Sequence, residues 1–147
     1  MTLTRILSSN DAYFALLRDD PVRPLIPHDQ RIGTNRDVFV IERPHPAAVI
    51  CVSYLGHVPS TESELFVECL SPDTAVFYTV WSYKPGAGRD IILEVSKYIR
   101  ESMPHITRFV TLSPHTELAR RFHLKNGATE FRMNTETVNF EYVSQPQ

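Results

Sequence analysis

The sequence predicts one α/β (or α+β) domain built on a mixed, mostly antiparallel β-sheet, and three observations lead to that prediction. The chain has 147 residues, the usual length of one domain, so we expect a single domain over residues 1–147. The middle of the chain alternates short runs of β-branched and aromatic residues with turn residues, which is typical of antiparallel strands. The second half alternates strand-like and helix-like segments, and a helix between two strands makes those strands parallel neighbours.

The N-terminal segment "SSNDAYFALLRDDP" predicts a helix from about Asn10 to Arg18. Polar capping candidates precede apolar residues at helical spacing, and Asp20-Pro21 ends the pattern. The next segment, "PVRPLIPHDQRIGTN", contains three prolines, so we expect a loop or a short broken helix there.

About seven segments are expected to form the strands of the sheet. The first four are separated by the turn signals "RPHP", "GHVPSTES" and "SPD" and predict an antiparallel meander. The fourth and fifth enclose a helix and should therefore be parallel neighbours. The expected strands are residues 37–42, 47–55, 64–70, 74–83, 106–112, 128–133 and 137–143.

Two longer helices complete the prediction and place helices on both faces of the sheet. "GAGRDIILEVSKYIRESM" carries its apolar residues on one helical face, and Pro104 lies beyond its end. "PHTELARRFHLKN" is the second helix, with Gly127 as the residue after its C-cap.

The bulk composition excludes several classes of function. A formal net charge of -2 gives no reason to expect binding to nucleic acid or to an anionic membrane. The N-terminus has no apolar run of signal-peptide length, and no stretch is long enough to cross a bilayer. Cys51 and Cys69 lie in apolar runs without metal-ligand spacing, so we expect reduced cysteines, a cytoplasmic protein and no metal site.

The segment "SYKPGAGRD" follows a predicted strand and opens a predicted helix. Gly86 and Gly88 allow a ligand to approach the backbone, and the free N–H groups of the first helical turn attract anions. Lys84 and Arg89 add positive charge, so the segment is a candidate pyrophosphate site. The same glycines also fit an ordinary helix start, and the local sequence alone slightly favours that simpler interpretation.

The segment "FVTLSPHTELARRFHLKNGA" contains the two other candidate residues. Ser113-Pro114 matches the start of a helix, with serine as N-cap and proline at the first helical position. His123 lies on a helix face shared with small and apolar residues, where a structural histidine is the simpler interpretation. Local sequence alone therefore favours structural roles for both residues.

Several motifs together resemble the catalytic domain of the malonyl-CoA decarboxylases, which has the fold of the GNAT acetyltransferase superfamily. They are "TAVFYTVWSY", "FVTLSP", "RFHLKNGA", "RMN" and "NFEY", and the resemblance covers roughly residues 37–142. The chain resembles a minimal form, without the family's N-terminal helical domain. Only nine residues separate Ser113 from His123, where the family carries a long helical insertion.

The resemblance implies specific roles for the candidate residues. Ser113 and His123 would form the catalytic pair. The loop before the helix would hold the pyrophosphate of CoA, and its residues are Lys84, Gly86, Ala87, Gly88 and Arg89. Ser113 would hydrogen-bond the malonyl carboxylate or the thioester oxygen, and His123 would either hold the carboxylate or deliver a proton.

The implied reaction converts malonyl-CoA, or a related acyl-CoA, to acetyl-CoA and CO2. The thioester is itself the electron sink, so no metal or organic cofactor is expected beyond the CoA of the substrate. Backbone N–H groups of residues 74–83 are candidate donors to the developing oxyanion. Two alternatives stay open: a GNAT-type N-acetyltransferase that uses acetyl-CoA with Glu68 as its base, and a non-catalytic acyl-CoA-binding module.

Overall fold

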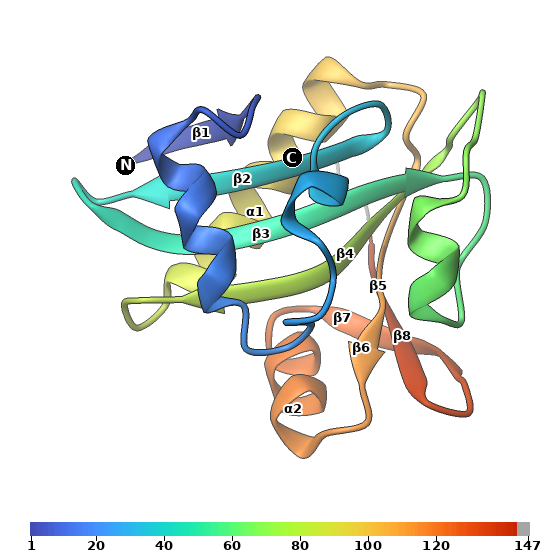
Figure 1. The fold of residues 1–147 in the computed structure, drawn as a ribbon. Helices are drawn as coiled ribbons and strands as arrows, with labels where there is room; N and C mark the ends of the chain where they lie inside the picture. The colour runs from blue at the N-terminus through green and yellow to red at the C-terminus, as the bar shows by residue number, and fades with distance from the viewer. Residues whose placement is uncertain (144–147) are drawn as a thin grey trace.

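The computed structural model describes residues 1–143 and consists of an eight-stranded mixed sheet with helices on both faces (Figure 1). Two α-helices, α1 (Ala87–Ser102) and α2 (Glu117–Lys125), accompany three 3-10 helices, η1 (Ala12–Asp19), η2 (His28–Arg31) and η3 (Glu62–Phe66). The strands are β1 (Thr2–Ile6), β2 (Arg36–Glu42), β3 (Pro46–Leu55), β4 (Thr74–Ser82), β5 (Arg108–Thr111), β6 (Ser113–Pro114), β7 (Ala128–Met133) and β8 (Thr137–Tyr142).

The strand order is β1-β2-β3-β4-β5-β8-β6, and β7 pairs with β8 outside this path. Only β4 and β5 are parallel, and every other neighbouring pair is antiparallel. The predicted mixed, mostly antiparallel sheet is therefore confirmed, as is the parallel pairing around the crossover helix α1.

Two apolar layers enclose the sheet. Alternate residues of the strands point to opposite faces, so Phe39 packs toward α1 whereas Val38 and Val40 pack toward η1 and η2. Residues Ile91 and Val95 of α1 fill the first layer. Figure 1 shows α1 behind the sheet and η1 in front of it.

The structure differs from the sequence-based expectation in three places. The strand expected at residues 64–70 is wrong: Thr61 and Glu64 form a capping box that starts η3, and the chain then continues without a strand. The helix expected from Asn10 to Arg18 is a 3-10 helix. The first strand, β1, was not predicted, because its five residues form a stable strand only through pairing with β2.

The chain around Ser113 also differs from the simplest expectation. Ser113 does not cap α2; it pairs with Val138 of β8 as the short strand β6. Thr116 is the N-cap, and its hydroxyl accepts a hydrogen bond from the backbone N–H of Ala119. Two residues, His115 and Thr116, therefore stand between the sheet and the helix, and Ser113 belongs to the sheet.

The parallel pair β4–β5 is short. The last paired residues are Phe77 and Thr111, and a register shift between β3 and β4 falls at Tyr78. A bulge of this kind bends a strand and increases its twist. Within the described residues, the second half of β4 has no partner on the β5 side, and this gap between strands positions the candidate site.

Candidate active site

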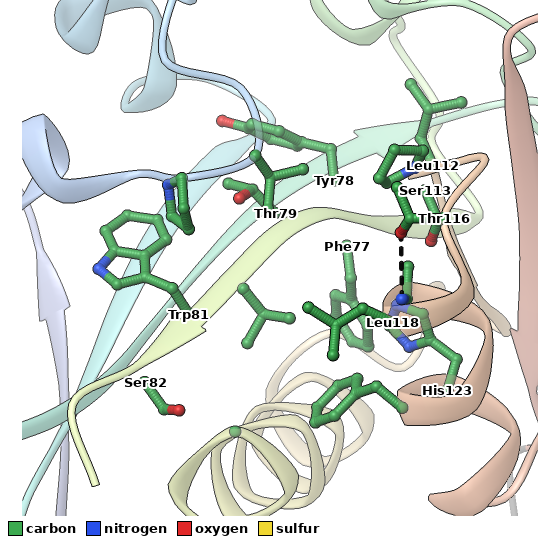
Figure 2. Close-up of a pocket in the computed structure, with 17 residues that line it drawn as sticks. Phe77, Tyr78, Thr79, Trp81, Ser82, Leu112, Ser113, Thr116, Leu118 and His123 are labelled. Atoms are coloured by element: carbon green, nitrogen blue, oxygen red, sulfur yellow. Dashed lines mark hydrogen bonds between the residues drawn. The ribbon is translucent and has the colours of Figure 1, made fainter.

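A pocket of about 380 Å³ lies where β4 and β5 separate. Its walls are residues 77–82 of β4, the corner at residues 112–114, Thr116 with one face of α2, Gly88 at the start of α1, and Pro21 and Val22 of the N-terminal loop. In the view of Figure 2, Ser113 and His123 lie at the end of the pocket away from Trp81. Within residues 1–143, no lining residue is an aspartate, glutamate, lysine or arginine, so His123 is the only lining side chain of this range that can become a cation.

His123 is the one fully buried residue of α2, with 6% of its surface exposed. Its ring stacks on Phe140, and its Nδ1 atom forms a 2.7 Å hydrogen bond with the hydroxyl of Tyr142. Nε2 has no hydrogen-bond partner within residues 1–143. Burial lowers the pKa of His123 to about 4, so the imidazole is neutral at physiological pH.

Ser113 is 3% exposed and its hydroxyl is 2.8 Å from that of Thr111. The Thr111 hydroxyl also accepts a hydrogen bond from the backbone N–H of Phe140. The structure therefore brings Ser113 and His123 to one pocket, but each hydrogen-bonds a different partner and neither bonds the other. Thr111 and Tyr142 were not singled out from the sequence, although both lie within motifs that carry the resemblance.

The segment predicted to bind pyrophosphate forms the start of helix α1. Gly86 is the N-cap residue of α1 with φ 79°, a left-handed conformation that glycine adopts without strain. The N–H groups of Gly88 and Arg89 have no hydrogen-bond partner within the described chain, so the helix end is open to an anion. Ala87 is buried beneath this turn.

The charged residues of the loop lie on the surface. Lys84 donates a 2.8 Å hydrogen bond from Nζ to the carbonyl of Arg43, and Arg89 is exposed. Of the five predicted loop residues, Gly88 alone borders the pocket. A Cβ atom at Gly88 would lie 3.2 Å from two ring carbons of Phe122, so a glycine here keeps α1 close to α2.

Glu68 lies away from the pocket. It borders a separate hollow together with Asn35 and Arg36, in the segment that was wrongly expected to be a strand. The predicted base of the acetyltransferase alternative is therefore not at the candidate site.

Two other kinds of site or segment are absent from residues 1–143. No group of three or more histidine, cysteine, aspartate or glutamate side chains is arranged to hold a metal ion in this range. None of its helices has both the length and the apolar character needed to cross a membrane.

Neither a protein-family model nor a curated protein matches the sequence. Solved structures do match. The malonyl-CoA decarboxylase of Rhodopseudomonas palustris aligns with a TM-score of 0.77 at 19% identity, over 97% of this chain and 59% of that chain. The Agrobacterium vitis enzyme aligns with a TM-score of 0.66 at 22% identity, over 82% and 35%. A GNAT-like decarboxylase, GphF, in complex with isobutyryl-CoA aligns with a TM-score of 0.76 at 15% identity, over 97% and 99%.

These likenesses establish a GNAT-like fold, and the resemblance to malonyl-CoA decarboxylases is confirmed at the level of the fold. The chain spans 35% and 59% of the two malonyl-CoA decarboxylases, so it corresponds to one part of them. It spans nearly the whole of the GNAT-like decarboxylase, which fits a minimal domain of this fold.

Proposed function

We propose that this domain decarboxylates malonyl-CoA, or a related acyl-CoA, to acetyl-CoA and CO2. The observation that carries the proposal is that Ser113 and a neutral, buried His123 border one uncharged pocket between the diverging strands β4 and β5. In this proposal the CoA pyrophosphate lies at the open start of α1, and its acyl end enters the pocket. The thioester accepts the electrons, so the reaction needs no metal or organic cofactor beyond CoA.

His123 is proposed to bind the carboxylate and then supply the proton. A carboxylate that enters the pocket meets no other side chain that can become a cation, and a nearby negative charge raises the pKa of histidine. The imidazole therefore takes up a proton as the substrate binds. When CO2 leaves, the negative charge passes to the enolate, and it is neutralised only when the imidazolium gives up its proton, which burial also favours.

Electrons and protons balance over the steps of the proposed reaction. The bond between the carboxylate carbon and the α-carbon breaks, and its electron pair moves into the thioester to form an enolate. The imidazolium then gives its proton to the α-carbon and returns to the neutral form, so one proton is consumed per CO2 released. General acid catalysis of this kind typically contributes ~10²–10⁴-fold.

Ser113 is proposed to donate its hydroxyl hydrogen to the thioester oxygen. That oxygen gains negative charge as the enolate forms, so a donor placed there stabilises the transition state more than the ground state. One such donor is worth about 3–4 kcal/mol. The hydroxyl is free to donate when Thr111 donates to it, because either oxygen of that pair can be the donor.

The test is to incubate the protein with malonyl-CoA in D2O and to follow acetyl-CoA by mass spectrometry. We expect acetyl-CoA with one deuterium, and a loss of ~10²-fold or more in kcat for Ser113→Ala and for His123→Gln. His115→Gln is the matched control, because His115 is exposed, bonds the carbonyl of Asn134 and does not border the pocket. Full activity in either pocket variant would contradict the proposal.

The two alternatives give different results in the same assay. An N-acetyltransferase consumes acetyl-CoA only when an amine is present, and the distance of Glu68 from the pocket argues against it. An acyl-CoA-binding module is stabilised thermally by malonyl-CoA but forms no product.

A further inference from the structure

We propose that Arg23 is a positioning residue that holds the separated ends of β4 and β5 at the spacing that the decarboxylation site needs. The inference rests on the proposed function for its catalytic consequence. Its structural part concerns only the geometry of the two strands, and that part is measurable without substrate.

Arg23 bridges the two strands directly after they stop pairing. Its Nε atom donates a 2.9 Å hydrogen bond to the carbonyl of Tyr78, and its Nη2 atom donates a 2.6 Å bond to the carbonyl of Leu112. These residues follow Phe77 and Thr111, the last parallel pair. A planar guanidinium holds its five N–H donors in a fixed geometry, so one side chain satisfies a carbonyl on each strand and fixes the distance between them.

A buried ion pair holds the backbone of Arg23 in place. Asp20 and Arg31 are 2.6 Å apart, and neither side chain is exposed to solvent. The Oδ1 atom of Asp20 accepts a 3.0 Å bond from the backbone N–H of Arg23, and Nη2 of Arg31 donates a 2.7 Å bond to the Arg23 carbonyl. Both backbone polar groups of Arg23 are thus tied to the pair, and the loop presents its side chain to the gap in a fixed position.

The guanidinium is held by protein groups and lies outside the lining of the pocket. Nη1 forms a 3.0 Å ion pair with Glu62, so all three nitrogens have protein partners, and the side chain is 9% exposed. Arg23 does not line the pocket, so it acts through the strands rather than on the substrate carboxylate.

The strands carry this effect to the site. Leu112 directly precedes Ser113, and Tyr78 and Leu112 both border the pocket. If the Arg23 bridge is lost, the corner that carries Ser113 is free to move relative to His123. A misplacement of about 1 Å is enough to cost ~10²-fold in catalysis.

The first test is Arg23→Lys, because one ammonium group cannot reproduce the two-carbonyl bridge. We expect kcat for malonyl-CoA to fall by ~10²-fold, while KM and the dissociation constant of CoA stay within a small factor of the wild type. Arg36→Lys is the control: Arg36 also donates to two backbone carbonyls, those of Gln30 and Phe66, and lies away from the pocket. An unchanged kcat, or a loss that appears mainly in KM, would overturn the proposal.

The second test is hydrogen–deuterium exchange without substrate. Loss of hydrogen bonds to a charged donor is worth about 1.5–3 kcal/mol, so amide exchange at residues 78–82 and 112–113 should rise by roughly tenfold or more in Arg23→Lys and not in Arg36→Lys. If the wild type forms no acetyl-CoA, the proposed function fails while this experiment still tests the bridge. Unchanged exchange at both segments would overturn it.

A measurement on the wild type covers the case in which Arg23→Lys does not fold. By NMR, the Nε–H proton of Arg23 should exchange with water far more slowly than that of the exposed Arg89, because it donates to the Tyr78 carbonyl. Equal exchange rates for the two arginines would show that the bridge does not exist in solution.

Discussion

The neutral state of His123 predicts a specific loss of stability at mildly acidic pH. Burial lowers the pKa of His123 from 6.5 to about 4, whereas the unfolded chain titrates near 6.5. Each pKa unit corresponds to about 1.4 kcal/mol, so protonation of His123 costs the folded protein roughly 3 kcal/mol.

The sign follows from which state binds the proton first. Between pH 6.5 and about 4 the unfolded chain carries a proton on this histidine and the folded protein does not. The free energy of unfolding is therefore undiminished above pH 6.5 and falls as the pH drops through this window. By pH 5 the loss from His123 should be about 2 kcal/mol.

Urea unfolding of the wild type and of His123→Gln at several pH values between 7.5 and 5 isolates this contribution. Glutamine keeps an amide that can bond the Tyr142 hydroxyl but does not titrate, so the variant should lose about 2 kcal/mol less stability than the wild type over this range. Carboxylates titrate in both proteins, and their effect cancels in the comparison. Parallel pH dependences for the two proteins would refute the reasoning, as would an NMR titration that places the pKa of His123 near 6.5.

Three further substitutions have expected outcomes. Tyr142→Phe leaves Nδ1 of His123 without its partner, so urea unfolding should show a loss of about 1–3 kcal/mol and kcat should fall. Gly88→Val should push Phe122 toward the pocket, and isothermal titration should show at least ~10-fold weaker CoA binding, equivalent to about 1.4 kcal/mol. Arg31→Met leaves a buried carboxylate unpaired and should cost about 3–5 kcal/mol in urea unfolding.

Each of these substitutions has a control with the same chemistry outside the site. Tyr13→Phe, at a tyrosine whose hydroxyl bonds Glu42 away from the pocket, should leave kcat unchanged. Lys97→Val, on the exposed side of α1, should leave CoA binding unchanged. Arg121→Met breaks an exposed pair with Glu117 and should cost less than about 1 kcal/mol. Equal effects in a variant and its control would contradict the corresponding prediction.

The sequence predicted the elements whose pattern is local. The period of apolar residues found α1, and runs of β-branched residues found β2, β3 and β4. The strand prediction for residues 64–70 was wrong because the apolar residues there resemble a strand, whereas Thr61 and Glu64 start the 3-10 helix η3. Strand β1 was missed because its stability comes from pairing with β2, more than 30 residues away in the sequence, and not from a local pattern.

The residues of the candidate site also differ in how far the sequence reveals them. Ser113 and His123 were found through motifs that happen to be short and contiguous, and both border the pocket. The Arg23 bridge left no local signal: Arg23 lies in a proline-rich loop, and its carbonyl partner Leu112 is 89 residues away along the chain. A single sequence shows which residues are present, but it does not show that a loop side chain enters the gap between two strands.

The C-terminal strand β8 explains why such a site needs the whole domain. It pairs with β5, with β6 and with β7, so Ser113 is aligned through Val138 while Tyr142 of the same strand orients His123. Arg23, from the other end of the chain, links β4 to Leu112, the residue before Ser113. Because the N-terminal loop and the C-terminal strand both hold the chain around the pocket, the spacing of Ser113 and His123 depends on tertiary contacts rather than on their nine-residue separation in sequence. A shorter or longer connection between these two residues would therefore be compatible with the same site, provided that β8 and the Arg23 loop are kept.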